Sequence, residues 1–155
     1  MAQRFRRSMA VGSVLFCCVD QIETRRQIWE AVQHRIDFFC DGRMGAEVLR
    51  VVTVSDSVSQ HRYPETLFTA QEAFAGSCTA KSTIYCANVA AGLMLSQFAK
   101  WLRHLIVDFD CQLNLLSNEL TVVEAASRAD SQYLKGTQNH ARPFVRQSDQ
   151  PVPVV

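Results

Sequence analysis

Asp20 is the residue of this sequence whose type and position best suit chemistry. It ends a short apolar run, Val14 to Val19, that is typical of a strand buried on both faces of a parallel sheet. From Ile22 the apolar residues recur with a period of 3.6, which predicts a helix. Asp20 would therefore lie at the carboxyl end of a strand, where a carboxylate can face phosphate through a metal ion. Glu23 follows three positions later, and on spacing alone this favours a helix-capping role for Asp20 over a functional one.

Cys78 is the second candidate for chemistry. It follows Gly76 and Ser77 at the predicted start of a helix, where the helix dipole and free N–H groups would lower the pKa of a thiol. The alternative is a small buried residue, as expected for Cys17 and Cys18. The six cysteines show neither a disulfide framework nor a CxxC pair, so we expect no zinc site and a reducing, cytoplasmic environment.

The composition limits the classes of partner. The 155 residues can form one domain with a real core, and 48% of them are hydrophobic. A net charge of +1 gives no reason to expect nucleic acid or an anionic membrane as a partner. The segment Ser82–Ala99 carries no charge, but its Ala, Gly and polar residues favour a helix packed on a sheet over a membrane span.

The remaining pattern predicts an α/β domain over residues 1–124 and a disordered polar tail over residues 125–155. The predicted elements after the first helix are a strand at Ile36–Cys40, a turn at Asp41–Gly42, a strand at Ala46–Val54 forming an antiparallel hairpin, a long helix at Cys78–Arg103 capped by Ser77 or Thr79, and a strand or strand pair within His104–Val123. Arg43 would lie in the glycine-flanked turn of the hairpin, where we expect it to be solvated.

The order of these pieces resembles the ThiF/MoeB/HesA family, bacterial relatives of the ubiquitin-activating enzymes. The segment CCVDQIETRR resembles the C(V/T)DN...R segment of that family, and FFCDGRMGAEVLRVVTV resembles the paired strands that follow it. GSCTAKSTIYCANVAAGLMLSQFAKWL resembles the crossover loop and long helix. The similarity covers residues 8–120. It implies the C-terminal part of a Rossmann-like domain, with a mixed sheet and a long packed helix.

The resemblance also implies an activity. Such enzymes use ATP and Mg²⁺ to adenylate the C-terminal glycine of a ubiquitin-like or sulfur-carrier protein. The resemblance leaves open whether this chain forms a homodimer. Asp20 matches the aspartate that engages magnesium–ATP. Arg25 matches an arginine that either contacts the nucleotide or fixes the turn. Cys78 matches a cysteine that forms a thioester or persulfide in some relatives.

Several family features are missing. The glycine-rich loop, the acidic residue for the ribose and the catalytic arginine and lysine all precede the matched aspartate, and too few residues precede Asp20 here to hold them. Gln21 stands where the family has Asn. The activity would therefore need N-terminal sequence or a partner chain. The alternatives are an inactive relative that serves as a protein-interaction module, or another nucleotide-binding α/β protein that matches by chance.

Overall fold

A computed structural model describes residues 9–68 and 83–124 of the chain. These residues form a mixed α/β fold around one five-stranded sheet in the order β1-β2-β3-β4-β5. The elements are β1 (Val14–Cys17), α1 (Ile22–Val32), β2 (Phe38–Gly45), β3 (Val48–Val54), α2 (Ser57–Arg62), the 3₁₀ helix η1 (Tyr63–Thr66), α3 (Ile84–Leu102), β4 (Asp108–Asn114) and β5 (Glu119–Glu124). β1 is parallel to β2, and all other pairs are antiparallel.

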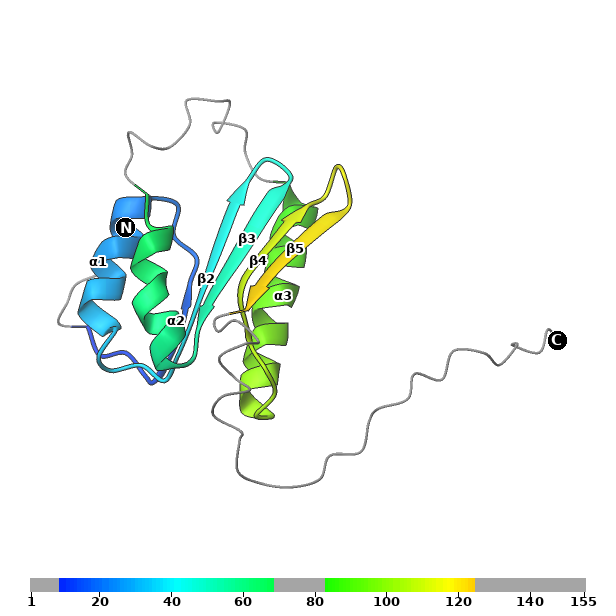
Figure 1. The fold of residues 1–155 in the computed structure, drawn as a ribbon. Helices are drawn as coiled ribbons and strands as arrows, with labels where there is room; N and C mark the ends of the chain where they lie inside the picture. Colours follow the sequence, from blue (N-terminus) through cyan, green and yellow to red (C-terminus); the bar gives the residue numbers. More distant parts are fainter. Residues whose placement is uncertain (1–8, 69–82, 125–155) are drawn as a thin grey trace, which may run out of the picture.

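The helices cover the sheet from both sides (Figure 1). α1, α2 and η1 lie on one face, and the long helix α3 lies on the other. The predicted hairpin and the C-terminal strand pair are therefore confirmed as β2–β3 and β4–β5. In the described part of the chain, no helix combines the length and the apolar character needed to cross a membrane.

Strand β2 differs from the sequence prediction. The predicted turn at Asp41–Gly42 is wrong, because both residues lie inside β2 and pair with Val52 and Val51 of β3. The hairpin turns instead at Ala46, whose φ of 52° lies in the left-handed region. A charged residue inside a buried strand needs partners for its carboxylate, and those of Asp41 are Arg25 of α1, Arg43 of β2 itself and Tyr63 of η1.

Helix α1 also begins differently from its prediction. Gln21 is the N-cap residue and its side chain makes no capping hydrogen bond, so the capping box of Asp20 and Glu23 is wrong. The predicted apolar face is confirmed for Ile28, Trp29 and Val32, which are all buried.

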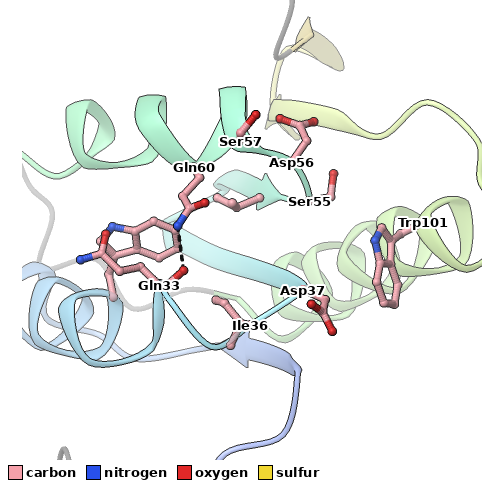
Figure 2. A pocket seen from close by; sticks show the side chains of 10 residues that line it. Gln33, Ile36, Asp37, Ser55, Asp56, Ser57, Gln60 and Trp101 are labelled. Atoms are coloured by element: carbon pink, nitrogen blue, oxygen red, sulfur yellow. Dashed lines mark hydrogen bonds between the residues drawn. The ribbon is translucent and has the colours of Figure 1, made fainter.

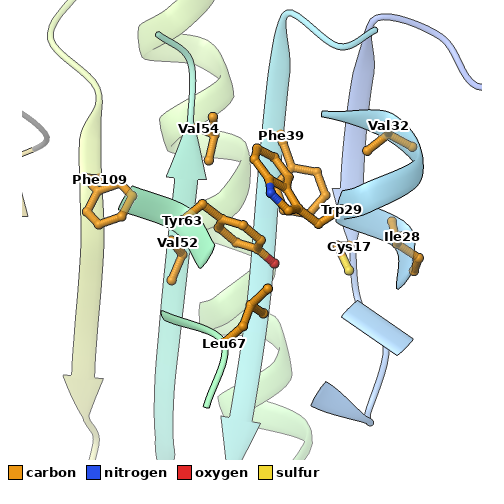
Figure 3. Close-up of a cluster of buried hydrophobic side chains, with 10 residues drawn as sticks. All are labelled: Cys17, Ile28, Trp29, Val32, Phe39, Val52, Val54, Tyr63, Leu67 and Phe109. Atoms are coloured by element: carbon orange, nitrogen blue, oxygen red, sulfur yellow. The ribbon is translucent and has the colours of Figure 1, made fainter. Parts of the chain in front are cut away.

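The core on the α1 side of the sheet is built around aromatic rings (Figure 3). Trp29 of α1 lies 4.5 Å from Tyr63 of η1 and 5.2 Å from Phe39 of β2, measured between ring centroids. Such tilted and edge-on pairs add about 0.5–1.5 kcal/mol each beyond area burial. The packing fixes α1 and η1 together over the sheet.

The core on the other face lies under α3. Thr83 caps this helix by accepting a hydrogen bond from the backbone N–H of Cys86, and Cys86, Ala90 and Met94 are buried against the sheet. The predicted packing of this helix on the sheet is thus confirmed, although the helix begins at Ile84. A Cβ atom on Gly42 would lie 2.6 Å from the sulfur of Met94, so Gly42 permits this close approach of helix and strand.

Candidate functional site

Asp20 lies in the bend between β1 and α1, at the carboxyl end of a strand that is parallel to its neighbour. Its side chain is exposed and makes no hydrogen bond or ion pair with any other described residue. The predicted position at a strand-to-helix turn is confirmed. The carboxylate is therefore free to accept hydrogen bonds from a ligand or from water around a bound cation.

Arg25 holds the turn that carries Asp20. Its guanidinium donates to the Asp41 carboxylate and to the backbone carbonyl of Val19, and also to the carbonyl of Gly42 at 3.1 Å. The side chain is only 6% exposed. These contacts join the end of β1, the first turn of α1 and the middle of β2, and they are the contacts of a turn-fixing residue. Burial lowers the pKa of the guanidinium from its ordinary value.

Asp41 is the centre of this arrangement and is fully buried. One carboxylate oxygen pairs with Arg25, while the other accepts from Arg43 Nε at 2.8 Å and from the Tyr63 hydroxyl at 2.9 Å. Arg43 also donates to the backbone carbonyl and the hydroxyl of Thr66, at 2.7 and 2.8 Å. We name Asp41, Arg25, Arg43, Tyr63 and Thr66 the Asp41 cluster.

The Asp41 cluster corrects the expectation that Arg43 is solvated. The side chain of Arg43 is 11% exposed, because it follows Asp41 by two positions in β2 and so shares its face of the sheet. Burial raises the pKa of Tyr63 to about 12, so its hydroxyl stays protonated and donates to Asp41 at neutral pH. An Asp and an Arg two positions apart within an otherwise apolar strand was the signal in the sequence that could have revealed the cluster.

The donor set around Asp20 limits how it could act on a metal. Among residues 9–68 and 83–124, no group of three or more His, Cys, Asp or Glu side chains could hold a metal ion. Asp20 alone therefore fits a cation only where phosphate oxygens and water complete the coordination shell, as Mg²⁺ commonly requires. In such a shell Asp20 would supply one carboxylate, as a ligand or as an acceptor from cation-bound water.

Cys78 lies outside the described residues. Of the five described cysteines, four are buried and Cys18 is exposed. The expectation that Cys18 is buried is therefore wrong. Burial raises the pKa of Cys40 to about 12 and that of Cys111 to about 11. These thiols stay protonated and are poor nucleophiles.

A separate cavity of about 330 Å³ lies at the other end of the sheet (Figure 2). It is lined in part by Asp37, which precedes β2, and by Ser55 and Asp56, which follow β3. Since β1 and β2 are parallel, Asp37 and Asp20 lie at opposite ends of the strands. The cavity is thus not part of the Asp20 site.

No family model matches this sequence, and no curated protein matches it. The resemblance to the ThiF/MoeB/HesA family rests on the sequence motifs alone. The geometry shows an exposed Asp20 and an Arg25 that holds the turn.

Proposed function

We propose that this chain supplies the magnesium-facing part of an ATP-dependent adenylyltransferase of the ThiF/MoeB/HesA type, with the phosphate-binding loop supplied by another segment or chain. The observation that carries the proposal is the exposed Asp20 carboxylate at the carboxyl end of a parallel strand, on a turn anchored to the buried Asp41 cluster. Ligands of open α/β sheets bind at this position.

In the proposed reaction, the C-terminal carboxylate of a ubiquitin-like or sulfur-carrier protein attacks the α-phosphorus of ATP. A bond forms between the carboxylate oxygen and the α-phosphorus, the bond to the β-phosphate bridge breaks, and pyrophosphate leaves with that electron pair. Asp20 would help to hold a hydrated Mg²⁺, which when bound would supply charge neutralisation at the phosphates. Arg25 acts as a positioning residue because its donors hold the turn and Asp41.

The test is carrier-dependent exchange of pyrophosphate into ATP, measured on the native protein from its own cells with whatever chain supplies the loop. Asp20→Ala should lower the magnesium-dependent exchange rate on the order of 100-fold, as for the loss of a group that stabilises transition-state charge. Asp37→Ala, which removes an exposed carboxylate at the opposite end of the sheet, should leave the rate unchanged. An Asp20→Ala protein with the full exchange rate would refute the metal-facing role.

A second candidate is a protein-interaction module without catalysis. One observation favours it: the guanidinium groups of Arg25 and Arg43 are engaged with the buried Asp41, so neither is available to bind phosphate. This candidate requires that a carrier protein bind without nucleotide and with equal affinity to the Asp20→Ala variant. Titration calorimetry with the carrier, in the absence of ATP, distinguishes it from the first.

A further inference from the structure

The position of the Asp20 carboxylate depends on the backbone of its turn. The side chain is exposed and has no partner among the described residues, so nothing in that part of the chain holds it directly. The Arg25 guanidinium holds the turn by donating to the backbone carbonyl of Val19. This carbonyl and the N–H of Asp20 belong to the same planar peptide group. The orientation of Arg25 therefore sets the orientation of the peptide group that carries Asp20.

The Asp41 carboxylate connects Arg25 to two further side chains. One of its oxygens accepts from Arg25, and the other accepts from Arg43 Nε at 2.8 Å and from the Tyr63 hydroxyl at 2.9 Å. The carboxylate is planar, so the donors on one oxygen also fix the direction in which the other oxygen points. Asp41 and Tyr63 are fully buried, so a lost donor there is not simply replaced by water.

Arg43 extends this series of contacts to the end of η1. Its terminal nitrogens donate to the carbonyl and the hydroxyl of Thr66 at 2.7 and 2.8 Å, while Arg26 of α1 donates to the carbonyl of Leu67 at 3.1 Å. Arg43 lies toward the carboxyl end of β2, which is parallel to β1. The end of η1 and the Asp20 turn therefore lie at the same end of the sheet, joined by consecutive hydrogen bonds.

We propose that Arg43 and Tyr63 are positioning residues for Asp20. They fix the direction of the Asp41 carboxylate, and that carboxylate fixes Arg25 and the turn that Arg25 holds. Among the described residues, neither Arg43 nor Tyr63 donates to the turn itself. A change at the end of η1 thus alters the Asp20 site from a distance. The effect on magnesium rests on the proposed function, whereas the coupling between the two segments does not.

A purely structural role for the Tyr63 hydroxyl is the alternative. Its loss would then lower the stability of the whole domain and would speed amide exchange at the start of α1 no more than at its end. Positioning predicts a selective response at the start. The helix offers a reporter at each end: the Arg25 N–H donates to the Gln21 carbonyl at 3.2 Å, and the Gln33 N–H donates to the Trp29 carbonyl at 2.9 Å.

The test is Tyr63→Phe, which removes the hydroxyl and keeps the ring that packs against Trp29. Native-state hydrogen exchange of the full chain should be faster at the Arg25 amide by about tenfold or more, and at the Gln33 amide by less than about twofold. Thr53→Val is the matched control, because it removes a buried hydroxyl that contacts Cys40 in the core under α3. It should show no selective effect at Arg25. Equal changes at both amides in Tyr63→Phe would overturn the positioning role.

A double variant tests whether the coupling runs through Arg25. Arg25→Lys keeps the charge but loses the planar fork that contacts Asp41 and Val19 together. This variant alone should speed exchange at the first turn of α1, and adding Tyr63→Phe should then change that exchange by less than about twofold. Fully additive effects of the two substitutions would overturn the route through Arg25.

The magnesium dependence of pyrophosphate exchange connects this coupling to the proposed function. A displaced Asp20 should hold a hydrated cation less well, so Tyr63→Phe should raise the Mg²⁺ concentration for half-maximal exchange about threefold or more. The rate at saturating Mg²⁺ should change less. Tyr85→Phe removes the other described tyrosine hydroxyl, which donates to Glu47, and should leave the magnesium requirement unchanged.

The two proposals fail in different ways. Pyrophosphate exchange that depends on Asp20 but has the same magnesium requirement in Tyr63→Phe would refute the positioning role alone. A selective response of the Arg25 amide, in a protein whose exchange of pyrophosphate does not depend on Asp20, would refute the proposed function alone.

Discussion

Arg25 is the cationic partner of one oxygen of the buried Asp41 carboxylate. Replacing Arg25 by Ala would leave a fully buried carboxylate short of one cationic partner and would free the Val19 carbonyl. Breaking a buried ion pair from one side costs about 3–5 kcal/mol. Urea denaturation should show this loss of unfolding free energy, while Arg35→Ala, at an exposed position, should change it by less than about 0.5 kcal/mol.

The double variant Arg25→Ala/Asp41→Ala tests whether the loss comes from the unpaired carboxylate. It should be destabilised by less than the sum of the two single variants, because neither partner is then left buried alone. Additive losses would show that the two side chains act independently.

The described cysteines differ in reactivity at the scale of single thiols. With pKa values of about 12 and 11, Cys40 and Cys111 have about one thiolate in 1,000 or fewer at pH 8. Cys18 is exposed. Iodoacetamide at pH 8, followed by peptide mass spectrometry, should therefore modify Cys18 first among the described cysteines. Equal labelling of Cys40 in the native protein would contradict the buried position of β2.

At the scale of elements, a small polar cluster connects the end of α3 to the start of β4. Asp108 accepts from Lys100 at 2.5 Å and from the Gln97 amide at 3.0 Å. Burial would raise the pKa of Asp108, but these two hydrogen bonds outweigh it and lower the pKa below the ordinary 3.8. A carboxyl whose pKa is lower in the folded state stabilises the fold above 3.8, and that stabilisation is lost as the pH falls through the folded pKa.

Asp108→Asn should therefore destabilise the protein by about 1 kcal/mol at pH 7, as expected for the loss of a charge-assisted hydrogen bond. The difference from the unmodified protein should shrink toward zero as the pH falls below 3.8. Thermal melts between pH 2.5 and 7 measure it. Asp37→Asn, at an exposed position, serves as the control, and a constant difference across this pH range would contradict the role of the Lys100 contact.

At the scale of the whole molecule, stability should decrease from the centre of the sheet outward. β2 and β3 have neighbours on both sides and helices on both faces, whereas β5 is an edge strand with exposed side chains. In native-state hydrogen exchange, amides of β3 should open only with global unfolding, and those of β5 should exchange at least about tenfold faster. Protection of β5 equal to that of β3 would show that another segment covers this edge.

The elements with a regular apolar period were predictable from the sequence. The period of 3.6 from Ile22 located α1, and the uncharged run from Ser82 located most of α3. Both patterns arise because these helices pack against a sheet. The position of Asp20 after β1 followed from the same change of period. The roles of the residues around it did not follow.

The local sequence determined β1, most of α1 and α3, and the position of Asp20 between a strand and a helix. Only the tertiary structure decided that Asp41 and Arg43 continue a strand instead of forming a turn, because their partners, Arg25 and Tyr63, lie 16 and 22 residues from Asp41 along the chain. A charged pair next to glycine has the local signature of a solvated turn. Its burial becomes favourable only when distant donors satisfy the carboxylate, and the spacing of Asp41 and Arg43 does not identify those donors.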